Sequence, residues 1–215
     1  MSAPKSRDSR IRTPRRLALT AGVFILVGVI AALFAATHPF GGGSDPSSKS
    51  PPGPAGSKAA FTFLSQQGSN YCSLDTKSVE HYANGNQLQG ACCSSMDQRK
   101  YEYQVANLRQ YAGISQIPTD PYDIPVSLAK QLIAYDGSIT LNSDQQPVYD
   151  QAISMTKDKG PCCCHCWRWY MTRGLVKYLI TQHNMDPTNA AQVVDLVNGC
   201  GGPLESSANG PSPPA

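Results

Sequence analysis

The strongest constraint on this chain is a run of twenty-one residues without a charged side chain, which begins at Leu17 and ends at Thr37. At about 1.5 Å per residue, a helix of this length spans roughly 30 Å, the thickness of a bilayer's hydrocarbon core. Six Lys or Arg residues precede the run, and the next one after it is Lys49. This asymmetry predicts a cytoplasmic basic segment at residues 1–16, a transmembrane anchor at 17–37, and a cell-membrane protein whose remaining chain is extracytoplasmic.

The same run could belong to a cleaved signal peptide. Such apolar regions are typically shorter, and they end at an A-x-A-like site that residues 35–37 match only loosely. No cysteine stands at the end of the run to carry a lipid. An uncleaved anchor is therefore the favoured interpretation, and the rest of the chain is exported under either one. The formal net charge of only +3 gives no indication of a nucleic-acid partner.

Composition divides the exported part into a linker, a domain and a tail. Residues 38–58 are rich in Gly, Ser and Pro, which predicts a flexible linker, and residues 203–215 predict a disordered tail of the same character. Residues 59–202 are enough to bury a substantial core, so this domain does not need disulfides merely to fold.

The domain is predicted to be all-α, a small cysteine-rich helical domain after the transmembrane helix. Asp123, Ser143 and Asp186 stand where they can cap helices, and no alternating strand pattern stands out. A further helix is expected to start at Pro161, with apolar side chains on nearly all sides and a polar stripe that includes Arg168, as is typical of a buried central helix. The expected helices cover residues 97–112, 123–135, 143–155, 161–183 and 186–198.

The motif with the most chemical content is Pro161-Cys162-Cys163-Cys164-His165-Cys166. If Pro161 begins a helix, Cys162 and Cys166 are one turn apart, with Cβ atoms about 5–6 Å from each other. The unpaired N–H groups of a helix start favour thiolates, and grouped thiolates repel one another unless a cation joins them. Cu(I) and Zn(II) accept thiolate ligands, so the motif predicts a thiophilic metal site for storage, sensing or delivery.

The preferred ligands are the alternate cysteines of the motif, Cys162, Cys164 and Cys166. The adjacent pair Cys92–Cys93 and the single Cys200 could complete the site. The chain has no nucleophile elbow, zinc-protease helix, phosphate loop or dinucleotide fingerprint, so no enzymatic reaction is predicted. The candidate metal ligands are Cys162, Cys164, Cys166, Cys163, His165, Cys92, Cys93 and Cys200.

Two alternatives remain open at this point. Exported proteins with an even number of cysteines usually form disulfides, so the domain could be disulfide-stapled and bind an unknown protein partner. A thiol–disulfide oxidoreductase is the other alternative, because Cys163 and Cys166 form a C-x-x-C motif at an expected helix start. A thioredoxin-like fold would need strands before that helix, and the sequence predicts none.

The pattern Pro161-Cys162-x-Cys164-x-Cys166 resembles the P-C-Y-C-G-C signature of a bacterial family named after that motif. The resemblance covers six residues, with Cys163 in place of the tyrosine and His165 in place of the second glycine. It implies an exported, membrane-anchored bacterial protein, it singles out Cys162, Cys164 and Cys166, and it implies no reaction.

Overall fold

The computed structural model describes residues 43–204. The predicted anchor at residues 17–37 and nearly all of the predicted tail lie outside this range. None of the helices within the range is long and apolar enough to cross a membrane. The elements are α2 (Lys58–Leu64), α3 (Thr76–His81), β1 (Gln87–Gln89), α4 (Gln98–Leu108), η1 (Arg109–Tyr111), β2 (Asp123–Pro125), α5 (Val126–Ser138), α6 (Gln145–Met155), α7 (Trp167–His183) and α8 (Pro187–Val197).

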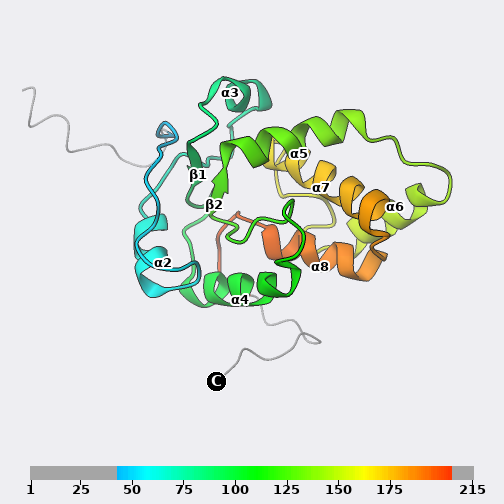
Figure 1. The fold of residues 1–215 in the computed structure, drawn as a ribbon. Helices are drawn as coiled ribbons and strands as arrows, with labels where there is room; N and C mark the ends of the chain where they lie inside the picture. Colours follow the sequence, from blue (N-terminus) through cyan, green and yellow to red (C-terminus); the bar gives the residue numbers. More distant parts are fainter. Residues whose placement is uncertain (1–42, 205–215) are drawn as a thin grey trace, which may run out of the picture. The chain divides into compact units, whose positions relative to one another are not determined.

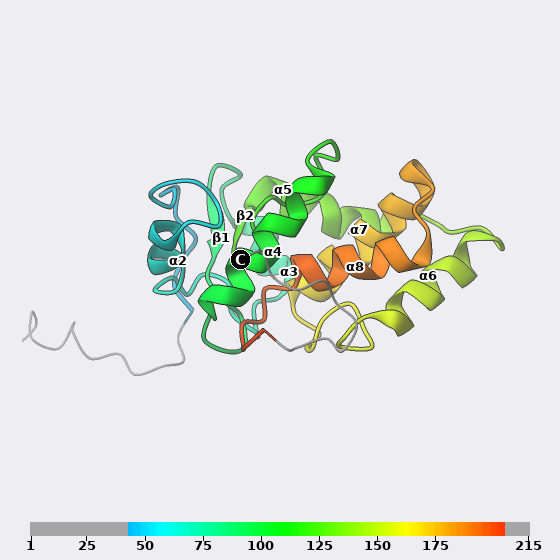
Figure 2. The same ribbon diagram turned by 90° about the horizontal axis from the view of Figure 1, so that it is seen from below.

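Helix α7 is the centre of the domain, as its apolar sequence predicts. It runs beside α5, with α8 next to it, while α2 and the sheet occupy one end of the domain and α6 the other (Figures 1 and 2). Its side chains Trp167, Met171, Leu175 and Leu179 are completely buried in the main core. This core lies directly behind the loop that carries the cysteine motif.

A glycine allows α5 and α7 to pack closely. A Cβ atom at Gly174 would lie only 1.8 Å from the carbonyl oxygen of Leu132 in α5. One turn away, the carboxylate of Asp136 pairs with Arg173 and Lys177, each at 3.1 Å. The two helices are therefore held by close backbone contact and, beside it, by ion pairs.

Capping residues set most of the helix starts where the sequence predicts them. The side chain of Asp97 accepts a hydrogen bond from the backbone N–H of Lys100 at the start of α4, and Asp186 does the same for two N–H groups of α8. Helix α6 differs slightly, because Asn142 rather than Ser143 accepts from the first free N–H groups. Helix α6 ends at Met155 and helix α8 ends next to Asn198, as predicted.

The fold is predominantly helical, but the expectation of an all-α domain needs one correction. Strands β1 and β2 form a two-stranded antiparallel sheet, in which Leu88 pairs with Ile124. Asp123 does not cap a helix; it lies in β2, where its carboxylate accepts from the Gln89 amide at 2.9 Å. Three-residue strands are too short to show an alternating pattern, so they could not be predicted from the sequence.

The start of the central helix also differs from the prediction. Helix α7 begins at Trp167, and residues 161–166 form a loop in place of the expected first helical turns. Tertiary hydrogen bonds hold this loop: the backbone N–H of Trp167 donates to Leu74 at 2.9 Å, and the hydroxyl of Thr156 bonds both the N–H and the carbonyl of Gly160. The helical spacing expected between Cys162 and Cys166 is therefore absent.

The described part of the expected linker packs against the domain. Ser47 forms a β-bridge with Gln87, and the carbonyl of Pro46 accepts from the Asn86 amide at 2.9 Å. The carbonyl of Lys49 accepts from Gln89 at 2.8 Å. A segment with no large apolar side chain is thus held by hydrogen bonds to the edge of β1.

Candidate metal centre

All eight cysteines of the chain come together from four separate loops. Cys72 follows α2, the pair Cys92–Cys93 follows β1, the motif cysteines precede α7, and Cys200 follows α8. Every one of them is a free cysteine in the structure. The convergence joins positions up to 128 apart in the sequence, from Cys72 to Cys200, so it is a product of the tertiary fold.

A backbone pairing between two of these loops sets the position of the paired cysteines. The N–H of Cys92 donates to the carbonyl of Gly199 at 3.0 Å, and the N–H of Ser94 donates to that of Cys200 at 2.9 Å. Gly201 has a φ of +78°, and a Cβ there would lie 2.0 Å from the Ser94 oxygen. The glycines around Cys200 therefore let its loop lie directly against the Cys92–Cys93 loop.

The sulfur atoms form a continuous network of contacts. Neighbouring Sγ atoms lie between 3.2 and 4.0 Å apart, and those of Cys92, Cys93, Cys163 and Cys200 each have more than one neighbour. The measured Sγ–Sγ distances are 3.3 Å for Cys92–Cys93, 3.6 Å for Cys92–Cys200, 3.2 Å for Cys93–Cys163, 4.0 Å for Cys93–Cys164, 3.4 Å for Cys162–Cys200 and 3.2 Å for Cys163–Cys200.

Three groups of three cysteines each have all their sulfurs within 4.8 Å of one another. Cys93 and Cys164 each belong to two groups, so the groups are joined rather than separate. Cys166 is outside these groups, but its thiol interacts with those of Cys162 and Cys92. The groups are Cys72–Cys93–Cys164, Cys92–Cys93–Cys200 and Cys162–Cys163–Cys164.

The predicted ligand set and the observed cluster differ at two residues. His165 is exposed, and its ring stacks on Trp169 with the ring centres 3.9 Å apart; the metal-competent groups found among residues 43–204 consist of cysteines alone. Cys72, which was not a predicted ligand, belongs to the cluster, where its backbone carbonyl lies 3.8 Å from the Cys164 sulfur. A lone cysteine has no local spacing by which the sequence could have assigned it.

The thiols influence each other's ionisation strongly. The pKa of Cys162 is lowered because the thiols of Cys166, Cys200 and Cys92 donate to its sulfur. The pKa values of Cys92 and Cys200 are raised, chiefly because they donate to Cys162, and burial raises the pKa of Cys93 to about 12. These hydrogen bonds favour the thiolate form at Cys162 over that at Cys92 and Cys200.

A buried arginine lies behind the cluster. Arg168, expected on a polar stripe, is only 1% exposed, and its guanidinium donates to the carbonyls of Val197 and Pro121 and to the side chain of Asn70. A Cβ at Gly199 would lie 2.4 Å from this guanidinium, so Arg168 packs directly against the loop of Cys200. The ion pairs found within residues 43–204 do not include it. Its positive charge favours a thiolate at Cys92.

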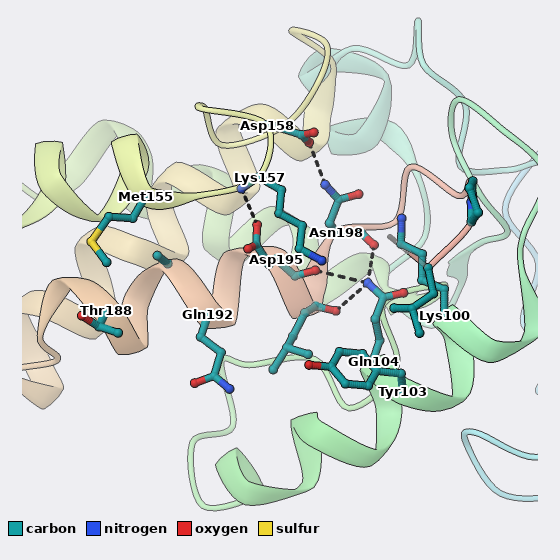
Figure 3. Close-up of a pocket in the computed structure, with 14 residues that line it drawn as sticks. Lys100, Tyr103, Gln104, Met155, Lys157, Asp158, Thr188, Gln192, Asp195 and Asn198 are labelled. Carbon is teal, nitrogen blue, oxygen red and sulfur yellow. Dashed lines mark hydrogen bonds between the residues drawn. The ribbon is translucent and has the colours of Figure 1, made fainter. Parts of the chain in front are cut away.

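One pocket of the domain is separate from the sulfurs. It has a volume of about 310 Å³ and lies between α4, α8 and the loop after α6 (Figure 3). Its polar groups already bond one another: Gln104 donates to the carbonyl of Asn198, whose amide donates to Asp158, and Asp195 accepts from the N–H of Lys157. These bonds brace the turn that leads to Cys200, so the pocket's polar lining has a structural role.

The sulfur spacing suits metal–thiolate bonding. Four thiolates at about 2.3 Å from one zinc ion lie about 3.8 Å from each other in a tetrahedron, and three in a plane lie about 4.0 Å apart. The longest observed separation, 4.0 Å, already matches these values, and the shortest, 3.2 Å, needs to widen by about 0.6–0.8 Å. Sulfurs that belong to two groups are placed to bridge two metal ions.

No protein-family model matches the chain, and neither the curated proteins nor the solved structures include one with significant similarity to it. The resemblance to the P-C-Y-C-G-C family therefore depends on the six residues of the motif alone and stays a prediction.

Proposed function

We propose that this protein binds a thiophilic metal, Cu(I) or Zn(II), in its eight-cysteine cluster, as a membrane-anchored extracytoplasmic protein that stores, senses or delivers the metal. One observation carries the proposal: eight cysteines from four loops meet in a single network of sulfur contacts. Apolar side chains of α5, α7 and α8 supply the larger part of the core, and Cys162 and Cys166 pack into its edge.

The shape of the network favours metal over disulfides. Four structural disulfides divide eight cysteines into four pairs, so that each cysteine has one partner in a narrow geometry. Here Cys200 contacts Cys92, Cys162 and Cys163 at 3.2–3.6 Å, so its sulfur has three neighbours of similar distance. A metal ion uses several such neighbours at once, whereas a disulfide uses one.

Charge gives a second argument. Thiolate is the form that binds metal, and several buried thiolates side by side would be unstable without a cation between them. A soft cation bound at the centre of each group offsets this repulsion, and thiolate ligands particularly favour Cu(I). Arg168, buried behind Cys200, adds a fixed positive charge beside the same sulfurs.

The test is metal analysis on the full-length chain, purified in detergent without oxygen and after loading with Cu(I) or Zn(II). We expect at least one tightly bound metal ion per chain, with sulfur ligands at roughly 2.3 Å by X-ray absorption if the metal is zinc. Changing Cys162, Cys164 and Cys166 together to Ser should remove most of the metal and leave the helical circular dichroism signal in place.

Ser94→Ala is the matched control, because Ser94 lies in the same cluster loops, carries no thiol and is exposed. It should load as much metal as the wild type. Thiols should also be counted in protein alkylated directly in the membrane. Eight oxidised cysteines together with no metal uptake would overturn the proposal and favour a disulfide-stapled domain.

A further inference from the structure

The eight sulfurs are not equally accessible. Cys92, Cys162 and Cys166 are only 2–8% exposed, and Cys200 is half-buried. The remaining cysteines open toward solvent: Cys72, Cys93 and Cys163 are exposed and Cys164 is half-buried. We call the first four the inner cysteines and the second four the outer cysteines.

The sequence produces this division through neighbouring cysteines. In the pair Cys92–Cys93 the first residue is buried and the second exposed, and the same holds for Cys162 and Cys163. One cysteine of each pair therefore faces the core while the other faces solvent. Adjacent cysteines of unequal exposure suit a cluster with two levels.

Short sulfur contacts join the two levels. The inner and outer cysteines meet at Cys92–Cys93, 3.3 Å apart, and at Cys200–Cys163, 3.2 Å apart. Among the outer cysteines, Cys93 lies 3.2 Å from Cys163 and 4.0 Å from Cys164. A metal ion can therefore move between the levels through shared ligands, without leaving sulfur coordination.

We propose that the inner cysteines retain metal, and that the outer cysteines exchange metal with a soft thiolate ligand supplied by a partner. This inference rests on the proposed metal-binding function and deepens it by assigning the face through which metal enters and leaves. The exposed sulfurs of Cys72, Cys93 and Cys163 come from three loops, so an incoming ligand can reach this face without unfolding any helix.

The exchange step is a ligand substitution without oxidation or reduction. Each incoming thiolate forms a bond to a metal ion at the outer cysteines as one metal–sulfur bond to an outer cysteine breaks, and the substitution repeats until no cysteine of the protein holds the ion. Each released cysteine takes up a proton from water, and the reverse reaction returns these protons when metal is loaded. The inner cysteines, shielded from solvent, take part only through the sulfur contacts that link the levels.

The experiment measures how fast metal leaves the full-length protein. The chain is loaded with Cu(I) without oxygen and mixed with excess of a colorimetric Cu(I) chelator, and the absorbance is followed in time. Wild-type protein should release copper in two phases whose rates differ by about tenfold or more. Two double variants, Cys72→Ser with Cys163→Ser and Cys92→Ser with Cys166→Ser, remove equal numbers of thiols from the two levels.

The outer double variant should lose the fast phase and keep the slow one, and the inner double variant should show the reverse. Cys163→Ser alone changes an exposed side chain, so it tests the fast phase even if the inner variant fails to fold. One release phase in the wild type, or equal effects of the two double variants on both phases, would overturn the two-level assignment. Failure of wild-type protein to load either Cu(I) or Zn(II) would instead contradict the metal-binding function itself.

Discussion

The contact between α5 and α7 can be tested by Gly174→Ala, which adds a single methyl group to α7. Ala usually stabilises a helix interior relative to Gly by about 1 kcal/mol. At Gly174 the new Cβ would lie 1.8 Å from the Leu132 carbonyl oxygen and 2.8 Å from the Asp136 nitrogen, and both neighbours are backbone atoms. Real Cβ atoms essentially never approach closer than 3.0 Å, so the helices would have to separate by about 1 Å.

Such a separation loosens the whole buried face of α7. Overpacking of this kind typically costs about 1–3 kcal/mol, and we expect Gly174→Ala to fall at the upper end because backbone cannot rotate away. For a chain of this size that corresponds to a fall in Tm of roughly 5–10 °C. The assay is thermal and urea unfolding followed by circular dichroism, on the metal-free protein under reducing conditions.

Gly137→Ala is the matched control in the partner helix. Gly137 also lies in a helix, α5, but a Cβ there meets no atom within 4 Å. This variant should be unchanged or slightly more stable, by up to about 1 kcal/mol. If both variants were equally stable, α5 and α7 could not be in the close contact described, and the reasoning would be refuted.

Two further predictions concern the core and the cluster. Leu175→Ala should lower the free energy of unfolding by about 2–5 kcal/mol, because this side chain is completely buried; a loss below about 1 kcal/mol in urea melts would show that α7 is not central. Apparent metal affinity should rise with pH: thiols with raised pKa, such as Cys93 at about 12, are protonated at neutral pH and must lose protons to bind metal. Competition titrations with a chelator at several pH values measure this, and a flat profile would contradict it.

Local sequence signals predicted the parts of the fold that local interactions determine. Asp97 and Asp186 cap α4 and α8 through hydrogen bonds to residues two or three positions away, so their effect is visible in a short window of sequence. The burial of α7 was predictable for the same reason, because its apolar residues surround the helix. The short strands were not, since β1 and β2 are distant in sequence and only three residues long.

The start of α7 was predicted wrongly because a distant contact decides it. Pro161 is compatible with a first helical position, yet the N–H of Trp167 donates to Leu74 and the helix begins there. The same applies to Cys72, which joins the cluster through a loop some ninety residues before the motif. The motif indicated which chemistry to expect, but only the tertiary fold brings Cys72 together with the seven cysteines that the sequence named as candidate ligands.

Arg168 shows how a buried charge can connect the core to the site. A guanidinium always carries its proton in proteins, and burial is costly unless the charge is offset. Its hydrogen bonds go to neutral groups, and the nearby carboxyl of Asp120, whose pKa burial raises to about 6, accepts from Tyr101 and interacts with Arg168 through its charge. Metal–thiolate groups with more thiolates than metal charge are anionic, and they would lie beside this cation through the loop of Gly199. If the cluster binds metal as proposed, the buried charge of Arg168, two residues after the last motif cysteine, is therefore placed to act as a second counter-charge beside that of Asp120.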